Sequence, residues 1–248
     1  MKIIYDAASD MGCVRSNNED MILIDRSFLR DESASGEVFV DGNSRFCAIV
    51  ADGMGGNNGG EFASDIACQE FDSWINDIPS KLTHGEIRAK VNEFVLNTHT
   101  LINSKGDEME EFSGMGTTLV GIFFYEGSPY WVNIGDSRIY IYRDGILRQI
   151  SRDHSMRNLM NNPELPANLI YNSLGSGTGT DSFADCDNIP LFENDCILIC
   201  SDGLSDMVDD EKLALLLKQS APASAYVSSA KAAGGEDNIS VITLSIYK

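Results

Sequence analysis

Runs of apolar residues of strand length recur along the whole chain. They cover residues 21–25, 46–51, 117–125, 130–134, 137–143, 196–200 and 239–247. Several are apolar at consecutive positions rather than alternating ones, as in CILIC at 196–200. A strand with that pattern is buried on both faces. The pattern therefore predicts a sheet covered by another sheet on one side and by helices on the other.

Apolar positions with the period of a helix occur in two long segments between these strands. The first covers 60–78 and is ended by Pro79, which cannot continue a helix. In the second, Thr83 and Glu86 have the spacing of a capping box, and the apolar stripe extends to about Ser104. Two long amphipathic helices are therefore predicted on the outside of the sheets.

The rest of the chain indicates turns, short helices and one excursion. YRDG at 142–145 is typical of a hairpin turn, and short helices are predicted after Asp209 and after Pro222. Residues 155–187 are rich in Asn, Pro, Ser and Gly, which predicts a mobile surface segment rather than core. No linker is long enough to divide residues 1–248, so we expect one domain of the α+β class, with helices outside antiparallel sheets.

Charge is the unusual feature of the composition. Apolar residues make up 43% of the 248, as in ordinary globular proteins, but 18 basic against 38 acidic residues give a net charge of −20. Such a surface repels nucleic-acid phosphates and anionic lipid headgroups, which argues against nucleic acids and membranes as partners. Carboxylates are also the oxygen ligands that hard divalent cations prefer.

The sequence predicts neither a membrane span nor an export signal. No segment approaches the ~20 continuous apolar residues of a span, and the first apolar run is interrupted at Asp6. The six cysteines form no C-x-x-C, and Cys196 and Cys200 would lie about 13 Å apart on one strand, too far for a disulfide. A reducing cytoplasm is the simplest interpretation.

Four aspartates lie beside the most apolar strands: Asp52, Asp136 and Asp202 follow strands, and Asp237 precedes the last one. Desolvating a carboxylate there is costly unless a cation or hydrogen-bond donors compensate. Any single one is explained as a turn residue, because Asp-Gly is a common turn dipeptide. If the four converge, their oxygen-only ligands select Mg or Mn. Two such ions about 3.5 to 4 Å apart can activate a bridging water and bind a phosphoryl group.

The N-terminal segment adds a cation to these carboxylates. Arg15 carries the forked guanidinium that binds phosphate in a bidentate manner, and Glu19 and Asp20 follow it closely. By itself an arginine followed by acids is most often a surface salt bridge. The three histidines lie outside all of these motifs. We expect all three at the surface or at helix ends: His84, His99 and His154. Of these, His154 is able to approach the excursion at 155–187.

Taken together, these features resemble the metal-dependent Ser/Thr protein phosphatases of the type 2C family, in their bacterial form. The resemblance covers nearly the whole chain. It comprises six motifs in the family's order: RSNNED at 15–20, ADGMGG at 51–56 with GEFAS at 60–64, GMGTT at 114–118, IGDSR at 134–138, CSDGLSD at 200–206 and GEDNIS at 235–240. It implies an αββα sandwich, two antiparallel β-sheets packed face to face and flanked by helices, with 155–187 as a short flap.

The resemblance also implies a metal centre of two Mn or Mg ions. Asp52 would bridge the two ions and the Gly53 carbonyl would bind one of them, whereas Asp202 and Asp237 would hold the other. Bacterial members often bind a third, weaker ion, for which Asp136 together with Asp202 is the matching pair.

The remaining implied roles concern the substrate. Glu19 and Asp20 would act through metal-bound waters, and Arg15 would bind the phosphate of phosphoserine or phosphothreonine. A metal-bridging hydroxide would then attack phosphorus without a covalent intermediate. Thr117 and Thr118 would support the strand behind the site. The general acid is unassigned, because Met54 stands where eukaryotic relatives carry a His.

The resemblance also implies that the partners are phosphorylated proteins, namely the substrates of a cognate Ser/Thr kinase. We expect the protein itself to be a cytoplasmic monomer.

Three other interpretations fit the sequence less well. The Gly-rich segment after residues 46–51 superficially resembles a dinucleotide-binding turn. However, the third required Gly falls on Asn58, and Asp52 would repel a pyrophosphate. A calcium-binding module would need the D-x-[DN]-x-[DN]-G spacing, which is missing. The remaining alternative is a catalytically inactive phosphatase-like sensor or scaffold, and the presence of every required carboxylate argues against it.

Overall fold

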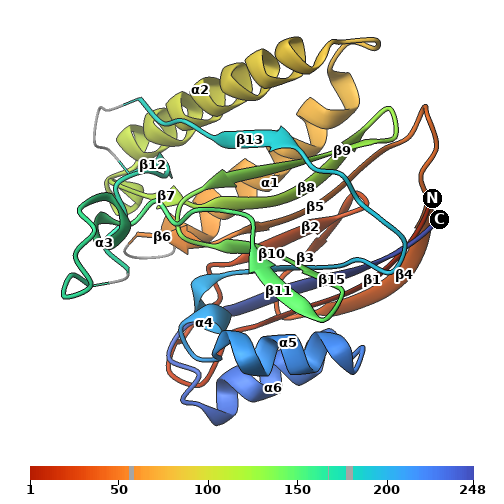
Figure 1. Ribbon diagram of the computed structural model, residues 1–248. Coiled ribbons are helices and arrows are strands. Elements are labelled where there is room, and N and C mark those ends of the chain that lie inside the picture. Colours follow the sequence, from red (N-terminus) through yellow and green to blue (C-terminus); the bar gives the residue numbers. More distant parts are fainter. Residues whose placement is uncertain (56–58, 167, 177–180) are drawn as a thin grey trace.

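Two antiparallel sheets lie face to face in the computed structural model, with helices on both outer sides (Figure 1). The structure describes residues 1–55, 59–166, 168–176 and 181–248. Residue 56 of the ADGMGG motif, Asn58 and part of the predicted flap therefore lie outside the described residues. The arrangement confirms the predicted α+β sandwich.

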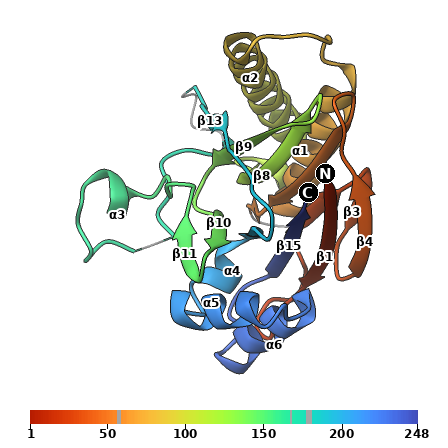
Figure 2. The same ribbon diagram turned by 45° about the vertical axis from the view of Figure 1, so that its right-hand side comes forward.

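The first sheet contains both ends of the chain. Its strand order is β11 (Ile146–Gln149), β10 (Arg138–Arg143), β14 (Cys196–Cys200), β15 (Ile239–Tyr247), β1 (Lys2–Asp10) and β4 (Ser33–Phe39). Lys2 is paired with Tyr247, so the termini lie side by side (Figure 2).

The second sheet is formed by the middle of the chain. Its strand order is β13 (Asp185–Asn188), β9 (Ser128–Ile134), β8 (Leu119–Tyr125), β5 (Arg45–Ala51), β2 (Met21–Ile24) and β3 (Ser27–Leu29). A small separate sheet has the order β12 (Leu174–Gly175), β7 (Gly116–Thr117) and β6 (Gly53–Met54).

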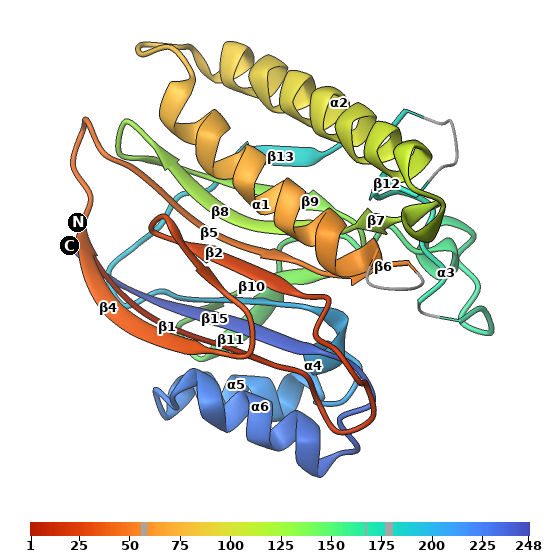
Figure 3. The ribbon, with the colours of Figure 1, turned by 180° about the vertical axis from the view of Figure 1, so that it is seen from behind.

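Helices cover the outer face of each sheet. The second sheet is covered by α1 (Gly59–Asp77) and α2 (His84–Glu108), which lie across it in the view from behind (Figure 3). The first sheet is covered by α4 (Asp202–Ser205), α5 (Asp210–Lys218) and α6 (Ala223–Ala232). The short elements η1 (Glu110–Phe112) and α3 (Met156–Leu159) lie outside these layers.

Burial of strands on both faces, predicted from the consecutive apolar runs, is confirmed. In β5, Phe46, Ala48 and Val50 belong to the core between the sheets, whereas Cys47 and Ile49 pack beneath α1 and α2. Residues of β5 thus contribute to two separate cores. Burying an apolar side chain of the size of Phe46 or Val50 stabilises the fold by about 1.5–3 kcal/mol.

The predicted turns and helix ends are largely confirmed. Thr83 and Glu86 form the capping box of α2, and the hairpin between β10 and β11 has positive φ at Asp144 and Gly145, as its two-residue turn requires. The second helix was predicted to end too early. It continues past Ser104 to Glu108 as a polar turn.

The prediction for residues 155–187 was wrong for much of the segment. Although α3 projects from the body (Figure 2), the segment also supplies β12, which pairs with β7, and β13, which pairs with β9. Leu174 is fully buried, and Asn172 and Cys186 are nearly so. Backbone pairing needs no apolar side chains, so a composition rich in Asn, Ser and Gly concealed these strands.

Among the described residues, no helix is both long enough and apolar enough to cross a bilayer. All six cysteines are free, as the spacing of Cys196 and Cys200 indicated for that pair.

Candidate active site

The four aspartates at strand ends meet at one cavity of about 230 Å³. The predicted residues that line it are Arg15, Glu19, Asp52, Gly53, Asp136, Asp202 and Asp237. Of the predicted site residues, Asp20 alone lies beneath the cavity, fully buried. The sandwich therefore brings together residues that are more than 200 positions apart in the sequence.

The backbone of Asp52 is held by the threonines of the GMGTT motif. Its N–H donates to Thr118 Oγ1 (3.0 Å), and its carbonyl accepts from Thr118 N (2.9 Å) and from Thr117 Oγ1 (2.9 Å). Thr118 Oγ1 also lies 2.8 Å from Ser137 Oγ, next to Asp136. The two threonines thus fix the strand behind the site, as expected.

Gly53 is required by close packing of the backbone. A side chain at this position would collide with the carbonyls of Gly60 and Glu19. The absence of a side chain lets β6 lie directly against the start of α1. The Gly53 backbone therefore reaches the cavity wall beside Asp52.

Hydrogen bonds join the N-terminal motif to the last strands. The Glu19 N–H donates to Asn238 Oδ1 (2.8 Å), and Asn238 Nδ2 donates to the carbonyls of Met11 and Asn17. The buried Asp20 accepts from Ser201 Oγ at 2.8 Å. Asn238 and Ser201 were not assigned roles from the sequence, although both lie within motifs that the resemblance used.

Arg15 and Asp237 form an ion pair across the mouth of the cavity. The Arg15 guanidinium donates to Asp237 Oδ2 at 2.6 Å, and both side chains are partly exposed. A guanidinium at this place can bind an anion that enters the cavity.

Burial, together with the crowding of carboxylates, governs the electrostatics of the site. Burial, followed by repulsion from Asp20, Asp202, Asp136 and Asp237, raises the pKa of Asp52 well above its usual value. Burial and the charge of Asp202 raise the pKa of Asp136 to about 8. The pKa values of Asp202 and Asp20 are raised as well, chiefly by burial. Such shifts mean that the carboxylates lack a compensating positive charge.

The donor set fits hard divalent cations. Asp202 Oδ1 and Asp20 Oδ1 are buried and have no hydrogen-bond partner among the described residues. Within that same part of the chain, however, no three Asp, Glu, His or Cys side chains are arranged closely enough to hold a single ion. The carboxylates face a common space, and Asp237 is turned towards Arg15, so binding an ion requires these side chains to rotate.

His154 is buried, which corrects the expectation of a surface or helix-end position. Its Nδ1 accepts from the Gly135 N–H (3.1 Å) and lies 2.8 Å from Asn172 Nδ2. Because a backbone N–H can only donate, the proton of the neutral ring is on Nε2, which lies 3.2 Å from Asp185 Oδ2. His154 therefore ties the predicted flap to the residue before Asp136, and its predicted approach to the flap is confirmed.

His99 is also buried, contrary to expectation, and Nδ1 of its ring accepts from the Gly175 N–H at 3.1 Å. Two further cavity residues, Asn168 and Ile170, come from the flap and were not predicted. No sequence signal marks them, because their place depends on how the flap folds back. His84 is exposed at the start of α2, as expected.

The sequence is similar to those of known phosphatases. A family model of protein phosphatase 2C matches residues 25–233. The chain belongs to the protein phosphatase 2C family. It is 30% identical to the serine/threonine phosphatase stp of Listeria monocytogenes, over 94% of this chain and 92% of that protein. It is 31% identical to the serine/threonine protein phosphatase PstP of Mycobacterium tuberculosis, over 98% of this chain but only 45% of that protein.

Solved structures agree with this assignment to the 2C family. The crystal structure of the M. tuberculosis phosphatase PstP/Ppp is matched with a TM-score of 0.79 and 30% identity over 100% of both chains. The PstP catalytic domain in complex with two manganese ions is matched with a TM-score of 0.76 and 29% identity, again over 100% of both chains. The predicted family and fold are therefore confirmed.

Proposed function

We propose that this 2C-family chain hydrolyses phosphoserine and phosphothreonine in proteins, using two Mn or Mg ions. The observation that carries the proposal is the convergence of Asp52, Asp202 and Asp237 on one cavity beside Arg15. The related PstP, which binds two manganese ions, supports the choice of metal. Divalent cations held there would activate a water and neutralise the charge of the phosphoryl group.

Each residue of the site has a separate proposed role in holding the ions. Asp52 and the Gly53 carbonyl would hold one ion. Asp202 and Asp237 would hold the second ion, to which Asp52 would also be a ligand. Asp136 with Asp202 would hold a third, weaker ion, and Glu19 and Asp20 would bind waters around the ions.

Arg15 would leave Asp237 and bind the substrate phosphate, because a guanidinium pairs with phosphate in a bidentate manner. This exchange frees an Asp237 oxygen as a metal ligand at the same time. Met54 lines the cavity without a titratable group, so it cannot supply the proton for the leaving oxygen.

The substrates would be phosphoproteins of a cognate Ser/Thr kinase. We further infer that residues 1–248 form one catalytic domain with a flap at 155–187, acting as a cytoplasmic monomer in bacterial signalling. The shared cores between and outside the sheets support a single domain.

The test is hydrolysis of p-nitrophenyl phosphate and of a phosphothreonine peptide with and without Mn. Asp202→Asn should abolish turnover, whereas Asp144→Asn, the same change in an exposed hairpin turn, should leave it intact. Turnover that persists in Asp202→Asn contradicts the proposal. A wild-type protein that binds Mn but hydrolyses neither substrate supports the inactive sensor or scaffold instead.

A further inference from the structure

A second cavity, of about 370 Å³, adjoins the candidate active site, and we call it the flap cavity. Met54 and Ile170 line both cavities, so the two cavities are adjacent at these residues. The other described walls of the flap cavity come from His99 on α2 and from the flap, including Tyr171, Asn172 and Asp181. A substrate bound at the carboxylates would therefore have this space beside it.

The walls of the flap cavity are fixed by buried polar groups. Asn172 is 6% exposed. Its amide nitrogen donates to the Phe183 carbonyl (2.8 Å) and its Oδ1 accepts from Ser182 Oγ (3.1 Å). His99, which also lines the cavity, accepts from the Gly175 N–H. Hydrogen-bonded, buried side chains of this kind hold these described parts of the lining in place.

The described lining combines apolar, aromatic and acidic residues. Met54 and Ile170, which both cavities share, have apolar side chains. The described lining also includes the aromatic Tyr171 and the acidic Asp181. Among the described lining residues Asp181 is the one acid, and no described basic side chain forms an ion pair with it.

An arginine side chain has the matching set of properties. Its aliphatic stem packs on apolar surface, and its planar cation both stacks on an aromatic ring and pairs with a carboxylate. We propose that the flap cavity takes an arginine of the substrate that flanks the phosphorylated residue, with Asp181 pairing its guanidinium. This inference rests on the proposed phosphatase function and names a substrate class for it.

The test is a series of phosphothreonine peptides with alanine elsewhere, in which one arginine is moved through the three positions before and the three after the phosphothreonine. Arginine at one of these positions should raise kcat/KM about fivefold over the all-alanine peptide, through a lower KM, as one partly exposed ion pair allows. In Asp181→Asn that ratio should fall to about 1, and Asp181→Glu should restore part of it.

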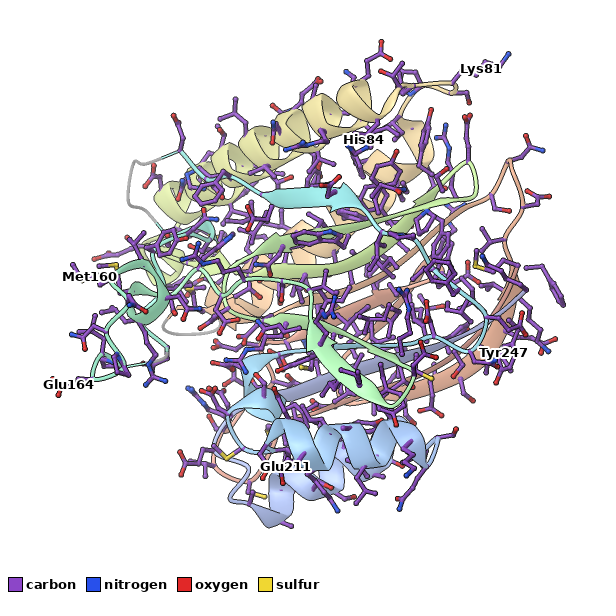
Figure 4. The ribbon with its side chains drawn as sticks, viewed as in Figure 1. Lys81, His84, Met160, Glu164, Glu211 and Tyr247 are labelled. Atoms are coloured by element: carbon purple, nitrogen blue, oxygen red, sulfur yellow. The ribbon has the colours of Figure 1, made fainter. Side chains whose placement is uncertain are left out.

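The matched control is Glu164→Gln. Glu164 is an exposed acid of the same segment and lies at its outer tip, away from the body of the molecule (Figure 4). The variant removes the same unit of negative charge, so it corrects for the general attraction of a basic peptide to a protein of charge −20. The arginine preference should be unchanged in Glu164→Gln.

Two results would overturn the inference: equal kcat/KM for arginine at all six positions and for the all-alanine peptide, or a preference that survives in Asp181→Asn. In either case, continued hydrolysis of the peptides leaves the phosphatase function standing. Failure of the wild-type protein to hydrolyse any peptide or p-nitrophenyl phosphate with Mn overturns both proposals.

Discussion

Metal binding should release protons, and the number should fall as the pH rises. The pKa of Asp136 is about 8, because the buried carboxylate lies near Asp202. For that pKa, Asp136 carries about 0.9 proton at pH 7 and about 0.1 at pH 9. Asp52 has a raised pKa as well. Ions ligated by Asp136 displace its proton, so at saturating Mn we expect about 0.9 proton released per chain from Asp136 at pH 7.

The raised pKa of Asp136 also determines how the affinity for Mn and the stability of the fold depend on pH. Because protons compete with the ion, Mn should bind more tightly as the pH rises from 7 to 9. In the metal-free protein, the raised pKa of Asp136 means that its protonated form stabilises the fold. That contribution is fully present below the unfolded value of 3.8 and is lost as the pH rises through about 8.

Calorimetric titration of Mn in Pipes and in Tris measures the released protons, because the two buffers differ in ionisation enthalpy. Asp136→Asn should lower the count at pH 7 by up to about 0.9 proton, whereas Asp144→Asn should leave it unchanged. Identical binding heats in both buffers at pH 7 would refute the assignment of these carboxylates as crowded, partly protonated ligands.

Three further predictions concern the framework and the phosphate site. His154→Ala leaves the Gly135 N–H without its acceptor and should cost about 1–3 kcal/mol in urea unfolding, whereas the oxygen of His154→Asn should recover much of it; equal losses would contradict the assigned hydrogen bond. Phe71→Ala removes a fully buried ring from an aromatic cluster and should cost about 3–5 kcal/mol, and a loss below about 1 kcal/mol would contradict the packing. Arg15→Lys should raise KM for p-nitrophenyl phosphate more than it lowers kcat, because lysine cannot bind phosphate with a planar fork, and an unchanged KM would argue against phosphate binding by Arg15.

The convergence of the aspartates was predictable because each lies beside a strand that the apolar pattern makes unmistakable. Once the strands are buried on both faces, their ends meet at the edges of the sandwich, and Asp52 and Asp202 come one and two residues after β5 and β14. The resemblance to the 2C family then indicated that these strand ends form one site. Side-chain orientation was not predictable in this way. The pairing of Arg15 with Asp237 joins residues that are 222 positions apart.

The first strand, β1, was not among the strands predicted from the sequence. Asp6 interrupts its apolar run, but alternation puts Ile3 and Ala7 into the core between the sheets and Asp6 on the outer face. There its Oδ1 accepts from the Ala223 N–H at the start of α6 (2.9 Å). A charge inside a strand is compatible with a half-covered face when it caps a helix packed beside it, so the break in hydrophobicity marks a contact with α6.

The buried histidines were missed for a related reason. Their environment is created by backbone N–H groups of Gly135 and Gly175, and a sequence gives no sign of which backbone groups a fold leaves without partners. Both histidines accept such an N–H on Nδ1, and both hold flap segments that line one or both cavities. Polar residues in the flap thus serve the packing of the site rather than the solvated surface that their composition suggests. It follows that the shape of the flap cavity depends on His99 and His154 as much as on the residues a substrate would touch.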